Sequence, residues 1–370
     1  MDLSSASPAA RWLRALRRTV SGENTSMKPS NSVCEDILKK LRGAFIAGRT
    51  KPFKFRIAQL QAIVRMLKNN ENLFVEALEN DMHRPKFETI LLEITTVKNE
   101  ALYAINNLEK WMQPEYIRKD MTSIFDDCFV HREPMGVVLI IGAWTFPIQL
   151  CLIPLIGAIA AGNCILLRLP AISSRASELL QKLLSNYLDS ECYQVIGEGL
   201  IDLAEILEST FDHIFFTAPT VLIDVRETDP VTQQDILGPV LPVVTVKGLE
   251  EAIQFINQRE RPLATYVYSD NSQVIAEMMS RTSSGSFCSN DSAVQNLYLG
   301  LPCCGAGIGG GLYGGKYGFD TFSQSRAYVL RHSVTECVTR FRYPPYLDTN
   351  LNLMLWVNYL SHKDGWCQIL

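Results

Sequence analysis

The longest apolar stretch of the chain covers residues 134–170, PMGVVLIIGAWTFPIQLCLIPLIGAIAAGNCILLRLP. One glycine and two prolines divide it into pieces too short for a membrane-spanning helix, which needs about 20 apolar residues. The pieces predict a strand over 137–141, a helix over 148–161 and a second strand over 164–169. Because both strands are apolar on both faces, we interpret the stretch as a buried βαβ unit of a parallel sheet rather than a membrane span.

The alternation of helix and strand patterns continues beyond this unit. The spacing of apolar positions predicts helices over 174–188 and 200–208, and strands over 192–196 and 213–217. Strands and helices that alternate in this way indicate a doubly wound α/β fold, here half of a dinucleotide-binding fold.

Helical periodicity precedes the apolar stretch, over residues 34–112. We expect two apolar seams there to pack against the sheet. The first seam is Ile57, Leu60, Val64 and Leu67, and the second is Phe87, Ile90, Ile94, Val97, Ala101, Ile105, Leu108 and Met112. Residues 120–133 then predict an extended arm.

The junction after the fourth predicted strand is unusual. HIFFT leads through Ala218 and Pro219 directly into TVLIDV, another strand-like run. Parallel neighbours need a crossover of about a dozen residues or more, and two residues that include this proline do not make a favoured hairpin turn. The pattern therefore favours a missing segment over the alternative, one long edge strand that contains a proline.

Farther on, the pattern predicts helices over 249–257 and 273–281 with a strand over 264–268 between them. A glycine-rich loop follows, LPCCGAGIGGGLYGGKYGFDTFS, in which Gly305, Gly307 and Gly310 satisfy GxGxxG. No strand precedes the match and no helix directly follows it, so we interpret it as accidental rather than as a phosphate-binding turn.

Composition narrows the class of protein. A net charge of −4 with 20% charged residues indicates a soluble globular protein, and the chain is not basic enough to indicate nucleic-acid binding. Ten cysteines form no CxxC pair and five histidines show no metal spacing, so we expect reduced cytosolic thiols and no metal. Residues 1–30 are basic and poor in acids, which fits a disordered tail better than a transit peptide or a basic amphipathic helix.

Nine motifs in order resemble the class 3 aldehyde dehydrogenases, especially the branch with a prenylated tail. They are IGAWTFP, AAGNCILLR, DHIFFT, DILGPVLPVV, ERPLATYVYS, SGSF, LPCCGAG, FDTFS and RYPPY. The resemblance covers about residues 34–370. It implies an α/β fold with a doubly wound cofactor domain, a catalytic domain and a dimerising β-arm.

The resemblance also implies a reaction, the NAD- or NADP-dependent oxidation of an aldehyde to a carboxylate. In this family a Cys thiolate attacks the aldehyde, an Asn side chain and a backbone N–H stabilise the oxyanion, and a Glu activates the hydrolytic water. Three family segments that carry this chemistry, GSxxVG, ELGGK and GQxC, do not occur in the sequence. They would follow Thr217, so we interpret the unusual junction as a deletion.

Five positions match the family's cofactor and substrate site by resemblance. Thr145 falls on the oxyanion Asn, beside Trp144, and Arg168 falls on the Lys that contacts the adenosine ribose. Asp235 and Leu237 fall on the Glu and Phe that position the nicotinamide. These changes indicate impaired binding of NAD or NADP, and no catalytic nucleophile is retained. Three other cysteines could in principle replace the nucleophile, namely Cys288, Cys303 and Cys304. We interpret them as ordinary buried or loop thiols.

The sequence ends Cys367-Gln368-Ile369-Leu370, a CaaX pattern whose final Leu indicates geranylgeranylation of Cys367. We therefore expect a cytoplasmic protein held on the cytosolic face of membranes or lipid droplets.

Taken together, the sequence predicts five segments. They are a disordered basic tail (1–33), a helical region with an arm (34–133), a partial dinucleotide-binding domain (134–217), a partial catalytic domain (218–330) and a C-terminal arm (331–370). The leading hypothesis is a catalytically impaired, lipid-anchored aldehyde dehydrogenase homologue. Two alternatives are a non-catalytic partner that forms a homo- or hetero-dimer with an intact relative, and a chain that does not fold stably because a sheet edge is uncovered.

Overall fold

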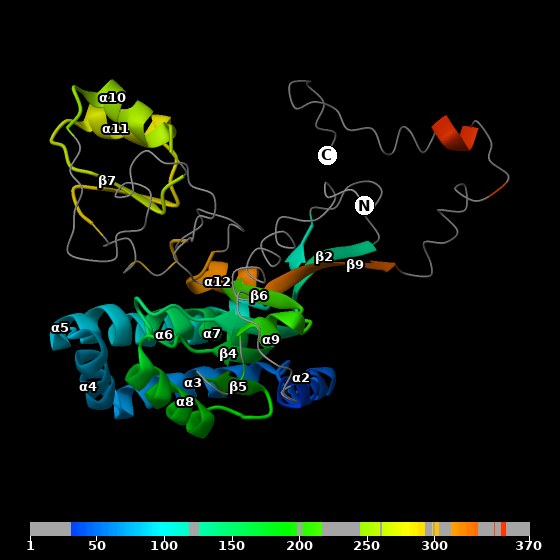
Figure 1. Cartoon of the computed structure of the whole chain (residues 1–370). Coiled ribbons are helices and arrows are strands. Elements are labelled where there is room, and N and C mark those ends of the chain that lie inside the picture. Colours follow the sequence, from blue (N-terminus) through cyan, green and yellow to red (C-terminus); the bar gives the residue numbers. More distant parts are fainter. Residues whose placement is uncertain are drawn as a thin grey trace, which may run out of the picture. The chain divides into compact units, whose positions relative to one another are not determined.

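A computed structural model of the chain describes residues 31–117, 126–197, 201, 203–216, 245–259, 261–292, 298, 300–302, 312–331, 344 and 349–352. Two compact units are present (Figure 1). One joins the described residues of 31–111 with those of 134–324, and the other joins the described residues of 112–133 with those from 325 onward.

The helices of the first unit are α2 (Asn31–Ile46), α3 (Phe53–Asn69), α4 (Glu71–Met82), α5 (Lys86–Glu88), the π-helix η2 (Thr89–Thr95), α6 (Thr96–Trp111), α7 (Gln149–Ala161), α8 (Ser174–Tyr187), α9 (Leu203–Glu208), α10 (Leu249–Asn257), α11 (Ser272–Arg281) and α12 (Gly315–Thr321). The strands of the chain are β1 (Glu115–Tyr116), β2 (Asp126–Pro134), β3 (Val137–Ile141), β4 (Cys164–Arg168), β5 (Tyr193–Ile196), β6 (His213–Phe216), β7 (Ala264–Val267), β8 (Ser286–Ser289) and β9 (Ser323–Arg331).

A parallel four-stranded sheet in the order β5-β4-β3-β6 forms the core of the first unit. The predicted βαβ unit is confirmed as β3, α7 and β4, with boundaries within a residue of the prediction. All five residues of β3 are buried, as expected for a strand covered on both faces. No helix among the described residues is long and apolar enough to cross a membrane.

Helix α7 is apolar all round because other helices surround it. It packs against α3, α6 and α12, and Cys151–Ala161 are all buried. Gly157 makes the contact with α12 possible, since a Cβ there would lie 3.1 Å from the carbonyl carbon of Gly318. The helix ends at Gly162, whose φ of 92° is a left-handed conformation that favours glycine.

A buried asparagine joins three segments around the sheet. The Asn163 side chain accepts a hydrogen bond from the Gly136 N–H at 3.0 Å and donates to the carbonyl oxygens of Ala158 and Phe322 at 3.2 and 2.9 Å. Its polar atoms are thus satisfied in the interior, as buried amides require.

The helical seams differ in part from the prediction. Leu60 and Leu67 of the first seam are buried, but Phe87, placed in the second seam, is 75% exposed. That placement was wrong because Phe87 lies in α5, and the π-helix that separates α5 from α6 adds a residue per turn, so Phe87 is out of phase with the buried face of α6. The buried face after this shift includes Ile94, Val97, Ala101 and Leu108, together with the carboxylates of Glu93 and Glu100.

Residues 245–292 form a smaller module with α10, β7, α11 and β8, in which the two strands pair in parallel. Its buried apolar residues are Ile253, Val267 and Met278. Tyr266 and Tyr268 are 38% and 65% exposed. This module therefore has a much thinner core than the four-stranded sheet.

The second unit is a three-stranded sheet in the order β1-β2-β9. Strand β2 falls within the predicted arm, while residues 118–125 lie outside the described part. Arg331 and Asp126 form an ion pair at 2.9 Å, and the rings of Phe129 and Tyr328 stack 5.0 Å apart. These contacts hold β9 against β2 across almost 200 residues of sequence.

Candidate functional site

The carboxyl ends of the central strands form a common edge. Ile141, at the end of β3, pairs with Arg168 of β4 and with Phe216 of β6. Because β4 follows β3 on one side and β6 lies on the other, the strand order reverses next to β3. Crevices at such switch points are where doubly wound folds bind ligands. The structure therefore brings Trp144, Thr145 and Arg168, from the loops and strand ends at this edge, into one region.

The loop that carries Trp144 and Thr145 is held by a buried ion pair. Arg84 forms a salt bridge with Glu93 and also donates from Nη2 to the carbonyl oxygen of Thr145 at 2.6 Å. Its guanidinium lies 4.6 Å from the centre of the Phe146 ring, in a cation–π arrangement. One cation thus fixes the backbone at Thr145.

Glu93 connects this loop to the start of α7. Its Oε2 accepts hydrogen bonds from the backbone N–H groups of Ile148 and Gln149 at 2.8 and 3.1 Å. Burial raises the pKa of Glu93, while Arg84 and the two amides act in the opposite direction. The carboxylate is completely buried, and these partners compensate for its removal from water.

A second carboxylate is bound at the start of α8. Asp81 accepts hydrogen bonds from Arg175 N and Ala176 N at 3.2 and 2.9 Å. Helix N-termini bind phosphate through such amides. The N-terminal amides of α7 and α8, the helices that follow β3 and β4, are therefore engaged by carboxylates of the chain itself, and these described residues do not fit a pyrophosphate there.

Arg168 is half-buried at the end of β4, and its guanidinium donates to the carbonyl oxygen of Leu169. The next turn is closed by Ser177, whose hydroxyl donates to the carbonyl oxygen of Pro170 at 2.7 Å. Arg168 therefore lies at the end of β4, just before the turn that leads into α8, and its ribose-binding role stays a prediction.

Cys151 is the thiol closest in sequence to this loop. It is fully buried in α7, and a Cβ at Gly142 would collide with its sulfur. Burial, and next the negative charge of Glu93, raise the pKa of this thiol far above its ordinary value. Because the thiolate is the reactive form, Cys151 is inert as a nucleophile at neutral pH.

Other predicted residues are separate from this region or lie outside the described part. Cys288 is half-buried in β8 of the 245–292 module. Outside the described residues lie Asp235, Leu237, Cys303, Cys304 and Cys367. For these positions the sequence-based roles stay predictions.

Sequence reasoning missed Arg84, Glu93 and Asp81, the residues that organise the edge. The sequence does indicate Glu93, because this charged residue lies within the apolar seam, next to Ile94. A charge inside an apolar periodicity indicates a buried, paired group. Arg84 and Asp81 carry no comparable signal.

The comparisons with known proteins agree with the fold and with the resemblance. The aldehyde dehydrogenase family profile matches residues 26–200 and 170–328. Aldehyde dehydrogenase family 3 member B1 of Rattus norvegicus is 34% identical over 451 residues, covering 87% of this chain and 96% of that protein. Member B2 of Mus musculus is 33% identical over 469 residues, covering 91% and 98%.

Solved structures show the same fold at low identity. The substrate-bound aldehyde dehydrogenase of Staphylococcus aureus has a TM-score of 0.75 at 20% identity, covering 87% of this chain and 99% of that chain. The glyceraldehyde-3-phosphate dehydrogenase GapN of Methanocaldococcus jannaschii, complexed with NADP, has a TM-score of 0.66 at 14% identity, covering 84% and 96%.

The alignment to the rat protein is longer than this chain. It spans 451 positions, whereas 87% of 370 residues is about 322, so about 129 aligned positions have no residue of this chain opposite them. Both ends of the relative are nevertheless matched, since 96% of it is covered. This chain therefore belongs to the aldehyde dehydrogenase family, as a class 3 member shorter in its interior than the relatives it matches.

Proposed function

We propose that this chain is an aldehyde dehydrogenase homologue that does not oxidise aldehydes by itself. The observation that carries the proposal is the lack of any ELGGK or GQxC segment in the sequence, where the family has its general base and its nucleophile. The internal shortfall of about 129 aligned positions supports a deletion that removed both. In a well-studied protease, loss of the nucleophile alone lowers turnover by about 10⁶.

The oxyanion position reinforces this proposal. Thr145 stands where the family has Asn, and a hydroxyl is shorter than an amide side chain. Arg84 binds the carbonyl oxygen of Thr145, so a backbone shift that would compensate for the shorter side chain has to break this hydrogen bond. Loss of one oxyanion donor costs about 10² to 10³ in rate in a comparable site.

Cofactor binding is also impaired in our proposal. NAD or NADP supplies a hydride acceptor in the family reaction. In this chain Glu93 and Asp81 bind the amides that could receive a phosphate at the starts of α7 and α8. The substitutions at Asp235 and Leu237 remove the side chains that resemblance assigns to the nicotinamide.

The test is a turnover assay of the purified full chain with hexanal and NAD or NADP, with the rat relative as positive control. We expect no formation of reduced cofactor above the rate without enzyme. A rate within about tenfold of the relative would overturn the proposal. A Cys151→Ser variant serves as control, because its buried thiol has no role in either outcome.

A second candidate function is a non-catalytic partner that dimerises with an intact family member. It is favoured by the second unit, in which β9 is mostly exposed along Gln324–Leu330 and is held to β2 by an ion pair. Co-expression with a full-length relative tests it. Recovery of a complex that is lost on removal of residues 323–331 supports the candidate, and separate elution of the two chains excludes it.

Attachment to a membrane or lipid droplet through Cys367 is a separate proposal, supported by the last four residues of the sequence. One prenyl chain binds membranes weakly, so we expect partial sedimentation of the wild type and a soluble Cys367→Ser variant. Equal fractionation of the two proteins would contradict lipidation.

A further inference from the structure

Two cysteines face each other at the start of neighbouring strands. Cys164 is the first residue of β4, and Cys192 directly precedes β5. Ile165 pairs with Tyr193 in the parallel register, and the Ile165 N–H donates to the Cys192 carbonyl oxygen at 2.9 Å. One position earlier, the two cysteines are therefore opposite each other with side chains on the same face of the sheet.

This placement suits a disulfide. Neighbouring strands lie about 4.8 Å apart. Disulfide-bonded residues have Cα atoms about 4.4 to 6.8 Å apart, so a bond between Cys164 and Cys192 needs no large backbone movement. Both residues are free thiols in the structure.

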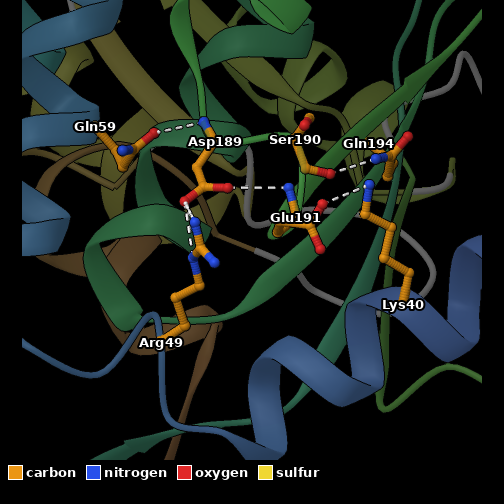
Figure 2. Close-up of polar contacts among 7 residues, drawn as sticks. All are labelled: Lys40, Arg49, Gln59, Asp189, Ser190, Glu191 and Gln194. Carbon is orange, nitrogen blue, oxygen red and sulfur yellow. Dashed lines mark hydrogen bonds and ion pairs between the residues drawn. The ribbon is translucent and has the colours of Figure 1, made fainter.

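Side chains of Arg49 and Gln59 bind the turn before Cys192 (Figure 2). Arg49 donates to the Asp189 carboxylate from Nε at 2.9 Å and from Nη2 at 2.7 Å, and Gln59 accepts from the Asp189 N–H at 3.0 Å. The Asp189 carbonyl oxygen then accepts from the Cys192 N–H at 3.0 Å. Cys192 is thus fixed opposite Cys164, with the Arg49 cation nearby.

The two thiols have different acidities. The pKa of Cys192 is lowered, first by hydrogen bonding from the adjacent Cys164 thiol, while the Arg49 charge also favours the thiolate against burial and the charge of Asp189. The same contact raises the pKa of Cys164. Cys192 is therefore the more acidic thiol of the pair, and Cys164 is the less acidic one.

We propose that Cys164 and Cys192 are a redox-reactive dithiol, which a hydroperoxide converts into a disulfide between β4 and β5. The Cys192 thiolate attacks the peroxide, which gives a sulfenic acid and, after protonation, an alcohol or water. The Cys164 thiol then attacks the sulfenic sulfur, and a water molecule leaves. The two sulfurs together supply the two electrons that reduce the peroxide.

Access to the buried pair comes through the Asp189 turn. Cys164 and Cys192 are both 0% exposed, but Ser190 and Glu191, next to Cys192, are on the surface. In the described part of the chain β5 is an outer strand of its sheet, so local opening of this turn reaches Cys192 without unfolding the centre.

The test treats the purified full chain with graded hydrogen peroxide, blocks remaining thiols with N-ethylmaleimide and maps peptides without reduction. We expect a Cys164–Cys192 linked peptide, with a mass loss of about 2 Da that dithiothreitol reverses. It should appear at peroxide doses at least about tenfold below those that oxidise Cys34 or Cys151, which are equally buried in this structure.

Variants separate the two roles. In Cys164→Ser, dimedone should label Cys192 after peroxide treatment, whereas Cys192→Ser should leave Cys164 unlabelled, and Cys34→Ser should keep the linkage. Wild-type chain unfolded in guanidinium is a control that needs no variant to fold, and its cysteines should pair without preference. Oxidation of other thiols before this pair, or the same mixed pairing in folded and unfolded chain, would overturn the proposal.

Discussion

The four-stranded sheet with its helices and the 245–292 module are built on different scales. In the sheet region every residue of β3 is buried, and charged groups such as Arg56, Glu93 and Glu100 lie inside. The described part of the module has three buried apolar residues, and its ion pair between Arg281 and Glu250 is exposed. The sheet region can therefore sustain its own fold, while the module is close to the lower limit of a stable core.

Buried charges add to the difference between the two regions, because removal of one partner of a buried ion pair destabilises the sheet region. A buried charge without its partner is strongly destabilising, whereas an exposed pair contributes little. Folding of the chain thus depends on a few polar contacts in one region and on limited apolar burial in the other.

The largest expected effect comes from Arg84→Ala. It leaves the Glu93 carboxylate buried without its cation, so we expect a loss of about 3 to 5 kcal/mol in the free energy of unfolding, measured by urea denaturation. Arg281→Ala in the module is the matched control and should leave the unfolding midpoint unchanged. Similar losses in both variants would contradict the contrast between the regions.

The second-largest difference is expected when a buried apolar side chain is truncated to alanine in each region. Leu166 in β4 is 0% exposed, so Leu166→Ala should cost about 2 to 5 kcal/mol in global stability. Ile253→Ala, at a module position that is 3% exposed, should shift only the signals of that module. Two-dimensional NMR of both variants during urea titration checks this, and a single shared transition in the Ile253 variant would count against an independent module.

Native-state hydrogen exchange should show the same difference without mutation. Amides of β7 and β8 are expected to open with a free energy at least about 2 kcal/mol below that of β3 and β4, because fewer buried contacts hold them. Mass spectrometry of exchanged peptides measures this. Equal protection in the two pairs of strands would mean that the module shares the stability of the sheet.

The smallest effect is pH dependent. Burial raises the pKa of Glu100 above its ordinary 4.5, and the Gly315 N–H, at 2.5 Å from its carboxylate, only partly offsets this. The folded state binds the Glu100 proton more tightly than the unfolded state does. The contribution of Glu100 to the free energy of unfolding is therefore complete below pH 4.5 and is lost as the pH rises through the folded pKa. The Glu100→Gln variant should therefore have a higher melting temperature than the wild type at pH 7 and the same melting temperature at pH 4. Calorimetry measures both.

Much of the sheet was predictable because its signals are local. The apolar runs of β3 and β4, and the Gly162-Asn163 end of α7, follow from residues adjacent in sequence. The π-helix and the exposed Phe87 were not predictable, since an irregular turn shifts the register of the seam. The edge itself is held by Asp81, Arg84 and Glu93, whose hydrogen bonds to the backbone of the edge reach more than 50 residues along the sequence, and no local pattern specifies such pairs.

The close contact between Gly157 and Gly318 has a consequence for synthesis of the protein. Helix α7 is made early, but the helix that packs on its glycine face follows 161 residues later in the sequence. During translation at about 5 to 20 residues per second, the nascent chain carries this apolar surface uncovered for about ten seconds or more. Ribosome-associated chaperones have that interval to engage it, and premature termination before Gly318 leaves it permanently open.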